Sequence, residues 1–246
     1  MDKENLFYVI YDHSVETREF ILAEENMKTV TFAEQIINTD IVRLEINGKN
    51  AHDLTPLREL TDIKSLVLEE NQITDITPLN SLTNLKTLIL CHNQINDIAA
   101  LHTLTDLTTL SLWDNQVDDI KPLRGLINLI ALGLGNNNIT DITPLQSLVN
   151  LNEADLEHNK INDVTPLQKL INLPKLYLSD NKIEDVSPLK TLVNLTELGL
   201  YKNQITDVTP LYSLNNLTKL ELQDNPLTDT QIDELRCKLP NCEILF

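Results

Sequence analysis

Three carboxylates alternate along one short stretch of this chain, at Glu153, Asp155 and Glu157. Alternate residues of a β-strand point to the same side, about 7 Å apart, so the three acids would face solvent together. Such a cluster could do acid–base chemistry, or it could attract a cationic group. Acid–base catalysis needs a pocket that excludes water, which the flat, open sheet expected here does not offer. We therefore expect a binding surface and not an enzyme.

The histidines do not assemble a catalytic site either. His92 and His158 are three periods of the repeat apart, about 14 Å at strand spacing, and no serine, histidine and aspartate share a neighbourhood. Gly133-Leu134-Gly135 lies within a predicted strand, so it is not a phosphate-cradling loop. We expect no catalytic residue and no cofactor. A metal site is not expected, since calcium needs six or more converging oxygens.

Large aromatic side chains lie on the same predicted surface as the acids. Only four aromatic residues occur between positions 38 and 235, and three of them, Trp113, Tyr177 and Tyr201, fall at outward positions of the predicted strands. The fourth, Tyr212, falls on the opposite side. Tryptophan and tyrosine dominate binding hot spots, so this surface is predicted to contact a protein. The alternative is that they are scattered surface aromatics.

Two glycines stand between Trp113 and the three acids. Gly133 and Gly135 point outward on one predicted strand, where glycine has no side chain to pack. We interpret them as the floor of a notch that receives a lysine or arginine of the partner by cation–π contact and charge-assisted hydrogen bonds. The alternative is that glycine and acid are tolerated on a solvated face. Val67, Ile89 and Cys91 form a predicted second, apolar contact.

Net charge narrows the class of partner. The chain has 246 residues, 37 acidic and 19 basic, for a formal charge of −18 at pH 7. Such a surface repels phosphate backbones and anionic lipid, so nucleic acid and membrane are poor partners. No apolar run is long enough to span a bilayer. We expect a monomer that binds a protein with a basic patch.

A 22-residue repeat positions all of these side chains. The segment Leu82–Thr103 returns at 104–125 and 126–147, and nine units run from about Asn38 to Leu235. Counted from the first leucine, positions 7 and 9 are apolar and alternate with outward positions 6, 8 and 10. This alternation predicts a strand with one buried face, repeated in parallel from unit to unit. A fixed period of this length is typical of a solenoid.

Polar residues also recur with the repeat. Position 12 is asparagine in eight units and position 16 is aspartate in nine. A buried amide can satisfy backbone groups where the chain leaves the sheet, and a short carboxylate can accept N–H groups in the following turn. The Thr-Pro-Leu that follows, as at Thr77–Leu79, predicts a threonine N-cap with proline at the first helical position.

The pattern LxxLxxLxLxxNxIxDIxPLxx resembles the 22-residue leucine-rich repeats of bacterial internalins and of the eukaryotic phosphatase-1 regulatory subunit. The resemblance implies an α/β solenoid, a right-handed superhelix with a parallel sheet on its concave face and short helical turns or extended segments on its convex face. It also implies protein binding through the concave face. A regulatory subunit of an enzyme and a structural or self-assembling spacer stay open as alternatives.

The N-terminal residues depart from the repeat. Residues 1–37 are predicted to cap the first coil, because a solenoid end exposes apolar side chains and a free sheet edge. Within this cap we predict strands at Leu6–Tyr11 and Arg18–Leu22 and a short helical turn at Phe32–Asn38. The cap could instead be a separate recognition element.

The C-terminal residues are predicted to close the other end of the repeats. The repeats then occupy 38–228 and the closing cap 229–246, with Asp229 as N-cap of a helix to about Lys238 and a last strand at Glu243–Phe246.

The spacing of the cysteines and the sequence of the first residues indicate the cellular compartment of the protein. Cys91, Cys237 and Cys242 make no disulfide framework, although the last two could pair. The start of the chain places acids before a short apolar run, unlike a signal peptide. We expect reduced thiols and a cytoplasmic protein, or a secreted one if a leader has been trimmed from this sequence.

Overall fold

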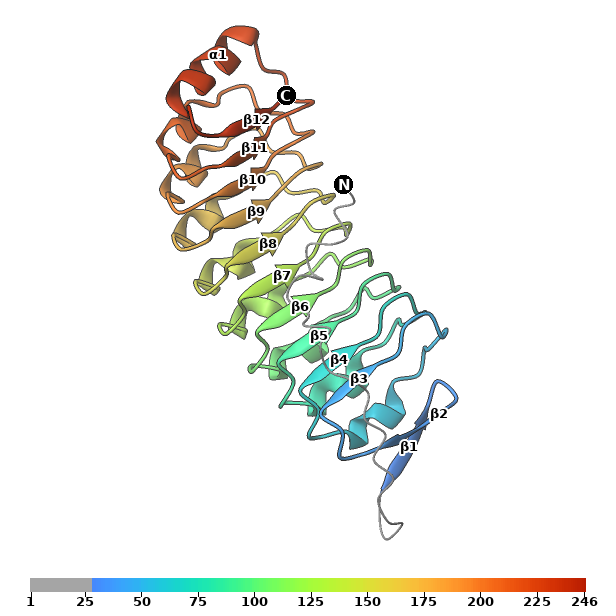
Figure 1. Cartoon of the computed structure of the whole chain (residues 1–246). Coiled ribbons are helices and arrows are strands. Elements are labelled where there is room, and N and C mark those ends of the chain that lie inside the picture. The colour runs from blue at the N-terminus through green and yellow to red at the C-terminus, as the bar shows by residue number, and fades with distance from the viewer. Residues whose placement is uncertain (1–27) are drawn as a thin grey trace.

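The computed structural model describes residues 28–246 as a curved solenoid built on one parallel sheet (Figure 1). The sheet has ten strands in the order β12-β11-β10-β9-β8-β7-β6-β5-β4-β3, so each strand pairs with its sequence neighbours. Their bounds are β3 Arg43–Glu45, β4 Ser65–Val67, β5 Thr87–Ile89, β6 Thr109–Ser111, β7 Ala131–Gly133, β8 Glu153–Asp155, β9 Lys175–Tyr177, β10 Glu197–Gly199, β11 Lys219–Glu221 and β12 Glu243–Leu245. The predicted parallel sheet is confirmed.

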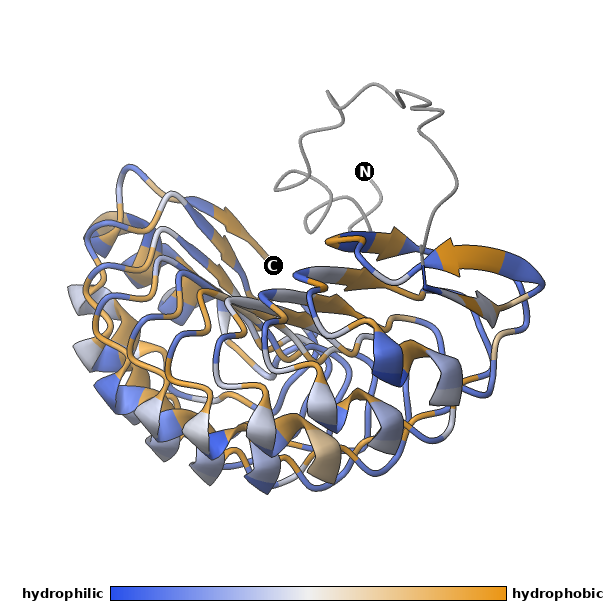
Figure 2. Cartoon of the chain, turned by 90° about the horizontal axis from the view of Figure 1, so that it is seen from below, coloured by the Kyte–Doolittle hydropathy of each residue, from blue (hydrophilic) through white to orange (hydrophobic). Residues whose placement is uncertain are grey.

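Short 3-10 helices form the outer side of each coil, while the strands line the inner side (Figure 2). A coil of 22 residues leaves room for only one or two such turns between strands. They are η3 Thr55–Glu59, η4 Thr77–Ser81, η5 Ala99–Thr103, η6 Lys121–Gly125, η7 Thr143–Ser147, η8 Thr165–Lys169, η9 Ser187–Thr191 and η10 Thr209–Ser213. The short outer turns and the inner sheet make the sheet face concave, as expected.

Leucine and isoleucine stack between these two sides in one continuous core. Leu66, Leu88 and Leu110 are directly paired in register and fully buried, and the other apolar positions behave alike. Ala154 occupies the same row and is also fully buried. Because each unit buries its apolar side against its neighbours, the core runs the whole length of the described repeats.

The asparagines at position 12 hold each coil to the previous one. In Asn137, for example, Oδ1 accepts the N–H of Val117 at 2.9 Å, and Nδ2 donates to the carbonyls of Leu112, Leu134 and Gly135. Equivalent bonds recur from Asn71 to Asn225. The side chain therefore satisfies backbone groups that leave the sheet without a ladder partner, as the sequence predicts.

The aspartates at position 16 also act as predicted, but the threonines that follow them do not. Asp75 Oδ1 accepts the backbone N–H of Thr77 at 2.7 Å, and the same bond recurs along the row. The N-cap of η4 is Ile76, and no side chain caps the helix. Ile76 is the cap because its carbonyl accepts the first hydrogen bond of the 3-10 helix, from the N–H of Leu79, which places Thr77 inside the helix. Pro78 is therefore the second helical residue, whereas the sequence predicts it at the first position.

The N-terminal prediction is wrong where the structure tests it. Phe32–Asn38 is not a helical turn: β1 (Thr29–Phe32) and β2 (Gln35–Asn38) pair as an antiparallel hairpin. Ala33 and Glu34 form its two-residue turn with φ of 48° and 64°, the left-handed geometry that twisted hairpins favour. Neither residue is a typical turn former, so the sequence carried no signal. The strands predicted at Leu6–Tyr11 and Arg18–Leu22 lie outside the described residues.

The C-terminal cap closes the sheet as expected, with one correction. Helix α1 (Asp229–Lys238) has Thr228 as its N-cap, not Asp229, because Thr228 and Gln231 exchange the two bonds of a capping box. Strand β12 then pairs in parallel with β11 and covers its edge. Cys91, Cys237 and Cys242 are all free. The expected boundaries at 37/38 and 228/229 stay predictions.

Candidate protein-binding face

Strand register aligns the outward side chains of the concave face in rows. Glu153 lies beside Lys175 and Asp155 beside Tyr177, and the same alignment continues from strand to strand. The rows differ along their length. Strands β4 to β7 carry only serine, threonine, alanine, glycine and aliphatic residues at positions 6 and 8, whereas β8 to β11 carry charged residues and Tyr177, and the terminal strand β3 carries Arg43 and Glu45. The acidic cluster predicted from the sequence therefore belongs to a charged half of the face.

Trp113 and Gly135 overturn the predicted notch. A Cβ on Gly135 would lie 2.4 Å from Nε1 and 2.5 Å from Cδ1 of Trp113, and 3.0 Å from Oδ1 of Asp155. The indole thus lies over Gly135 and does not stand beside it as a wall. His92 packs on the indole from the preceding coil, with ring centroids 5.1 Å apart. Gly135 leaves space for the ring, so its bare backbone is not the floor of a cation site.

Tyr177 and Gly199 form a second pair of the same kind. A Cβ on Gly199 would lie 3.3 Å from Cδ1 of Tyr177, 3.0 Å from Oγ of Ser179 and 3.4 Å from Oε1 of Glu157. The hydroxyl of Tyr177 donates to Oε2 of Glu197 at 2.7 Å. Burial raises the pKa of Tyr177, and the bond to Glu197 raises it further. The phenol is therefore a neutral hydrogen-bond donor with one face against its neighbour.

Charges alternate along the position-6 row, through Glu153, Lys175, Glu197 and Lys219. Lys175 Nζ lies 3.4 Å from Oε1 of Glu197, on the side away from Glu153. Burial raises the pKa of Glu153, with Lys175 acting in the opposite direction and Glu197 in the same one. Lys175 thus pairs with Glu197, and Glu153 is the carboxylate of this row whose charged form burial disfavours.

Three buried polar atoms lack a hydrogen-bond partner within residues 28–246: Oε1 of Glu153, Oγ of Ser179 and Oε1 of Gln223. All three residues point outward from the sheet in units six to nine, at positions 6 and 10. Buried polar atoms are normally paired, and each exception calls for a missing group. The three atoms are closed to solvent, so a partner molecule could not bond to them without a movement of the side chains.

The predicted apolar contact at Val67 and Ile89 is wrong as an exposed patch. The two residues are paired in register and only 5% and 3% exposed. Neighbouring strands lie about 4.8 Å apart, so facing aliphatic side chains on a concave surface cover one another. Cys91 Sγ lies 3.0 Å from Oγ of Ser111, and burial raises the pKa of this thiol to about 12. These residues offer a partner little surface.

A further polar row lies at position 11, next to the outward positions 6, 8 and 10. Its residues have φ near 50° to 55°, in the left-handed region, from Glu70 to Asp224. His92 Nδ1 lies 2.7 Å from Asp114, and Asp180 contacts both His158 and Lys202. The row is rich in aspartate, asparagine and histidine, which tolerate this backbone region; that preference was the available signal.

Gly133 lies in β7 with Ala131, and both are buried. Tyr201 is half-buried one coil beyond Ser179 at position 10. The structure therefore brings Asp155, Glu157, Tyr177 and Tyr201 into one region, while Trp113 lies at its border.

No group of three His, Cys, Asp or Glu side chains in the described part could hold a metal ion. No helix in that part is long and apolar enough to cross a membrane.

Comparison with known proteins agrees with this geometry. The family described as leucine-rich repeats in two copies matches residues 61–101, 83–125, 105–147 and 193–237. The structure is similar to that of an internalin C2 from Listeria monocytogenes, with 40% identity, a TM-score of 0.70, and coverage of 76% of this chain and 81% of that one. The chain belongs to the leucine-rich-repeat family. This leucine-rich-repeat protein is related to the Listeria internalins, as the repeat pattern indicated.

A second solved structure gives the same fold at lower coverage. A leucine-rich-repeat protein of Leptospira interrogans is 34% identical, with a TM-score of 0.74 over 78% of this chain. This chain spans only 51% of that protein, so the Leptospira protein has further parts to which nothing here corresponds. No curated protein sequence gave a significant match. Internalin-like repeats are generally binding modules without catalytic activity.

Proposed function

We propose that this leucine-rich-repeat protein recognises a partner protein through the charged half of its concave face, β8 to β11 with the following outward residues. The rows of charged side chains on these strands, with Tyr177 and Tyr201 among them, carry this proposal. Tyr177 and Tyr201, each half-buried, supply the flat contact area that hot spots use.

The chemistry of the face favours a basic partner. Asp155, Glu157 and Glu221 lie with Glu153 and Glu197 on neighbouring strands, and only Lys175 and Lys219 oppose them among the strand positions. Lysine or arginine of the partner would find charge-assisted acceptors there. The net charge of −18 adds long-range attraction for a basic surface and repels nucleic acid. A cytoplasmic location and a monomeric state stay predictions.

Two other functions would give different results in a binding experiment. A regulatory subunit would use the same face on an enzyme, so the identity of the captured partner separates this function from an adhesive one. A structural spacer needs no specific group on the concave face, and the charged rows of β8 to β11 with Tyr177 favour recognition over it.

A neutralising pair of substitutions tests the proposal. Glu153→Gln with Asp155→Asn keeps the shape of both side chains and removes two charges from the face. Asp118→Asn with Glu184→Gln removes two charges from exposed positions outside the strands. Partners are captured from native lysate by cross-linking to wild type, identified, and then measured as purified proteins against each variant.

We expect the two concave-face substitutions to weaken binding at least tenfold, which is about 1.4 kcal/mol of binding free energy. The two control substitutions should change the affinity by less than about twofold, which is less than half of that free energy. Equal binding by wild type and the concave pair contradicts the proposal, as does an equal loss in the control. Alanine at Trp113 and Tyr177 is a poorer test, because both rings also cover glycine backbone.

A further inference from the structure

An aliphatic stripe runs along one flank of the solenoid, away from the concave face. Position 2 carries Ile127, Val149, Ile171 and Val193 in four successive coils, and these side chains are 53%, 45%, 51% and 47% exposed. Each lies two residues after the last residue of a 3-10 helix, directly after the buried leucine that follows it. In the three preceding coils the same position is threonine. Exposed apolar residues are ordinary when single, but a continuous row marks an interaction surface.

The residues at and beyond this stripe are uncharged at positions 2, 3 and 5, whereas Arg124, Lys169 and Lys190 lie before it, at the ends of the 3-10 helices. Positions 2, 3 and 5 of units five to eight comprise twelve residues, and none of them is charged; we call these positions the uncharged flank. At the same positions in units two to four, four of nine residues are charged. In a chain with a net charge of −18, such a long neutral surface is where a second acidic molecule meets the least repulsion.

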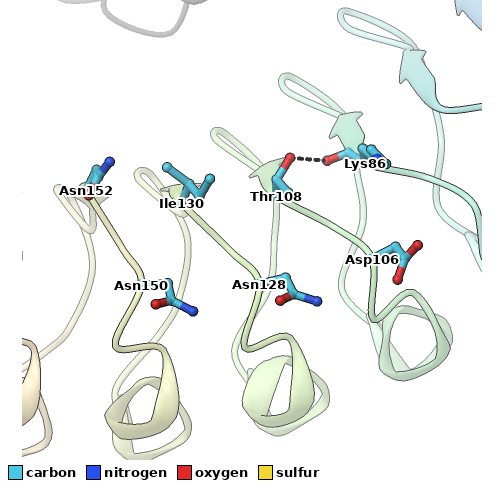
Figure 3. A pocket seen from close by; sticks show the side chains of 7 residues that line it. All are labelled: Lys86, Asp106, Thr108, Asn128, Ile130, Asn150 and Asn152. Atoms are coloured by element: carbon cyan, nitrogen blue, oxygen red, sulfur yellow. Dashed lines mark hydrogen bonds between the residues drawn. The ribbon is translucent and has the colours of Figure 1, made fainter.

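Asparagines fix the backbone beneath the stripe. Asn150 donates to the carbonyl of Ile127, and Asn194 donates to the carbonyl of Ile171, both at 2.8 to 2.9 Å. The carbonyls are thus satisfied within the chain, and the aliphatic side chains remain the outward feature. Ile130, 42% exposed, lies in a shallow hollow of about 550 Å³ that Asn128 and Asn150 of the uncharged flank also line, with Lys86 and Asp106 at its other end (Figure 3).

We propose that the uncharged flank is a self-association surface, on which a second copy of this chain packs its own flank. The stripe alternates isoleucine and valine at equal spacing, so a two-fold axis between Val149 and Ile171 sets Ile127 against Val193 of the second copy and Val149 against its Ile171. Every contact is then between a larger and a smaller aliphatic side chain. Such an isologous arrangement closes as a dimer.

The dimer is weak and strengthens with salt. Four coils at about 4.8 Å spacing give a short contact, at the low end of the size of specific interfaces. Two copies that each carry −18 repel one another, and salt screens this repulsion without weakening apolar contact. An interface built from ion pairs would respond to salt in the opposite sense. The proposal replaces the expected monomer at high protein concentration and leaves both concave faces open.

Sedimentation equilibrium of the full chain tests the proposal. Mass is measured from micromolar to millimolar protein at about 50 mM and about 500 mM salt. The disrupting variant is Val149→Thr with Ile171→Thr, because threonine already occupies position 2 in three other coils and the fold accepts it. The matched control is Ile36→Thr with Val42→Thr, which removes two exposed aliphatic side chains, 80% and 54% exposed, outside the flank.

Wild type is expected to approach the dimer mass as protein and salt rise, the flank variant to associate at least tenfold more weakly, and the control to match wild type. A wild type that stays monomeric throughout overturns the proposal. So does association that salt weakens, a flank variant that dimerises like wild type, or a control that loses as much. A monomeric wild type would leave the flank for a different protein.

Discussion

The indole of Trp113 lies over Gly135, one strand further along the same row of the concave face. Tyr177 lies in the same way against Gly199. In both pairs the ring belongs to the earlier coil and the glycine to the next. Glycine within a strand usually weakens it, but an aromatic ring across the strand covers the exposed backbone. The two glycines are therefore packing positions for rings and not gaps in the surface.

The first prediction concerns Gly135→Ala. The new Cβ would lie 2.4 Å from Nε1 of Trp113, so the ring must move. We expect a loss of about 1–3 kcal/mol in the free energy of unfolding and a red shift of the tryptophan emission. The chain has one tryptophan, so the emission reports this site alone.

The control for this prediction is Gly125→Ala, because no atom lies within 4 Å of a Cβ there. Its stability is expected to stay within about 0.5 kcal/mol of wild type. Adding Trp113→Ala to Gly135→Ala should remove the clash, so the two substitutions are not additive. Strict additivity would show that the ring does not lie on the glycine.

The second prediction concerns the asparagine row. Asn137→Ala deletes four side-chain hydrogen bonds and leaves buried groups of Val117, Leu112, Leu134 and Gly135 without that partner. We expect a loss of about 3 kcal/mol or more by denaturant unfolding. Asn128→Ala deletes one exposed bond to Thr105 and should cost less than about 1 kcal/mol. Equal losses would contradict the role given to the buried row.

The third prediction concerns the acid side of the pH range. Hydrogen bonds from Thr143 lower the pKa of Asp141, and the same cause acts at Asp75. A lowered folded-state pKa gives stability that is present above the unfolded-state pKa and is lost as pH falls through the folded-state value. Stability should therefore drop below pH about 4.

Asp141→Asn keeps an oxygen acceptor for Thr143 but cannot titrate. Its free energy of unfolding should fall less steeply with acid than that of wild type. Asp62→Asn removes the same charge from an exposed aspartate outside the row and serves as control. A slope for Asp141→Asn equal to that of wild type would argue against the row as a source of acid sensitivity.

The fourth prediction concerns Glu153→Gln. Burial raises the pKa of Glu153 above its ordinary 4.5, so its charged form is disfavoured in the folded chain. The associated stability is present below the unfolded-state pKa and is lost as pH rises through the folded-state value. Glutamine removes this penalty, so the melting temperature should rise slightly at neutral pH and match wild type in acid. A lower melting temperature at neutral pH would mean that Glu153 has an internal partner.

The repeat architecture could be predicted from the sequence because the same pattern of apolar and polar residues recurs in nine units of 22 residues. Asn137 and Asp141 behave as their spacing predicts, since their bonds are local to adjoining coils. The hairpin at 29–38 was missed because Ala33 and Glu34 are not typical turn residues. Thr228 was missed as a cap because threonine and aspartate are adjacent and both can cap.

The candidate site was less predictable. Sequence placed Trp113 and Gly135 on the same face but could not say toward which strand the ring leans, and this decides between a notch and a covered backbone. Likewise, Lys175 lies between Glu153 and Glu197 in register, and only the structure shows that its ammonium group pairs with Glu197. Side-chain direction within a row depends on the neighbours on both sides, which a period alone does not determine. The stripe at position 2 can be read from the repeat alone, because it depends only on the residue type at one recurring position.

Side-chain footprinting with hydroxyl radicals tests the central claim most directly. Tyr177 and Tyr201 lie on the charged half of the concave face, and Tyr212 lies in η10 on the outer side, as an internal control. With the captured partner bound, we expect oxidation of Tyr177 and Tyr201 to fall at least threefold while that of Tyr212 stays unchanged. Protection of Tyr212 with no change at Tyr177 and Tyr201 would contradict recognition through this face.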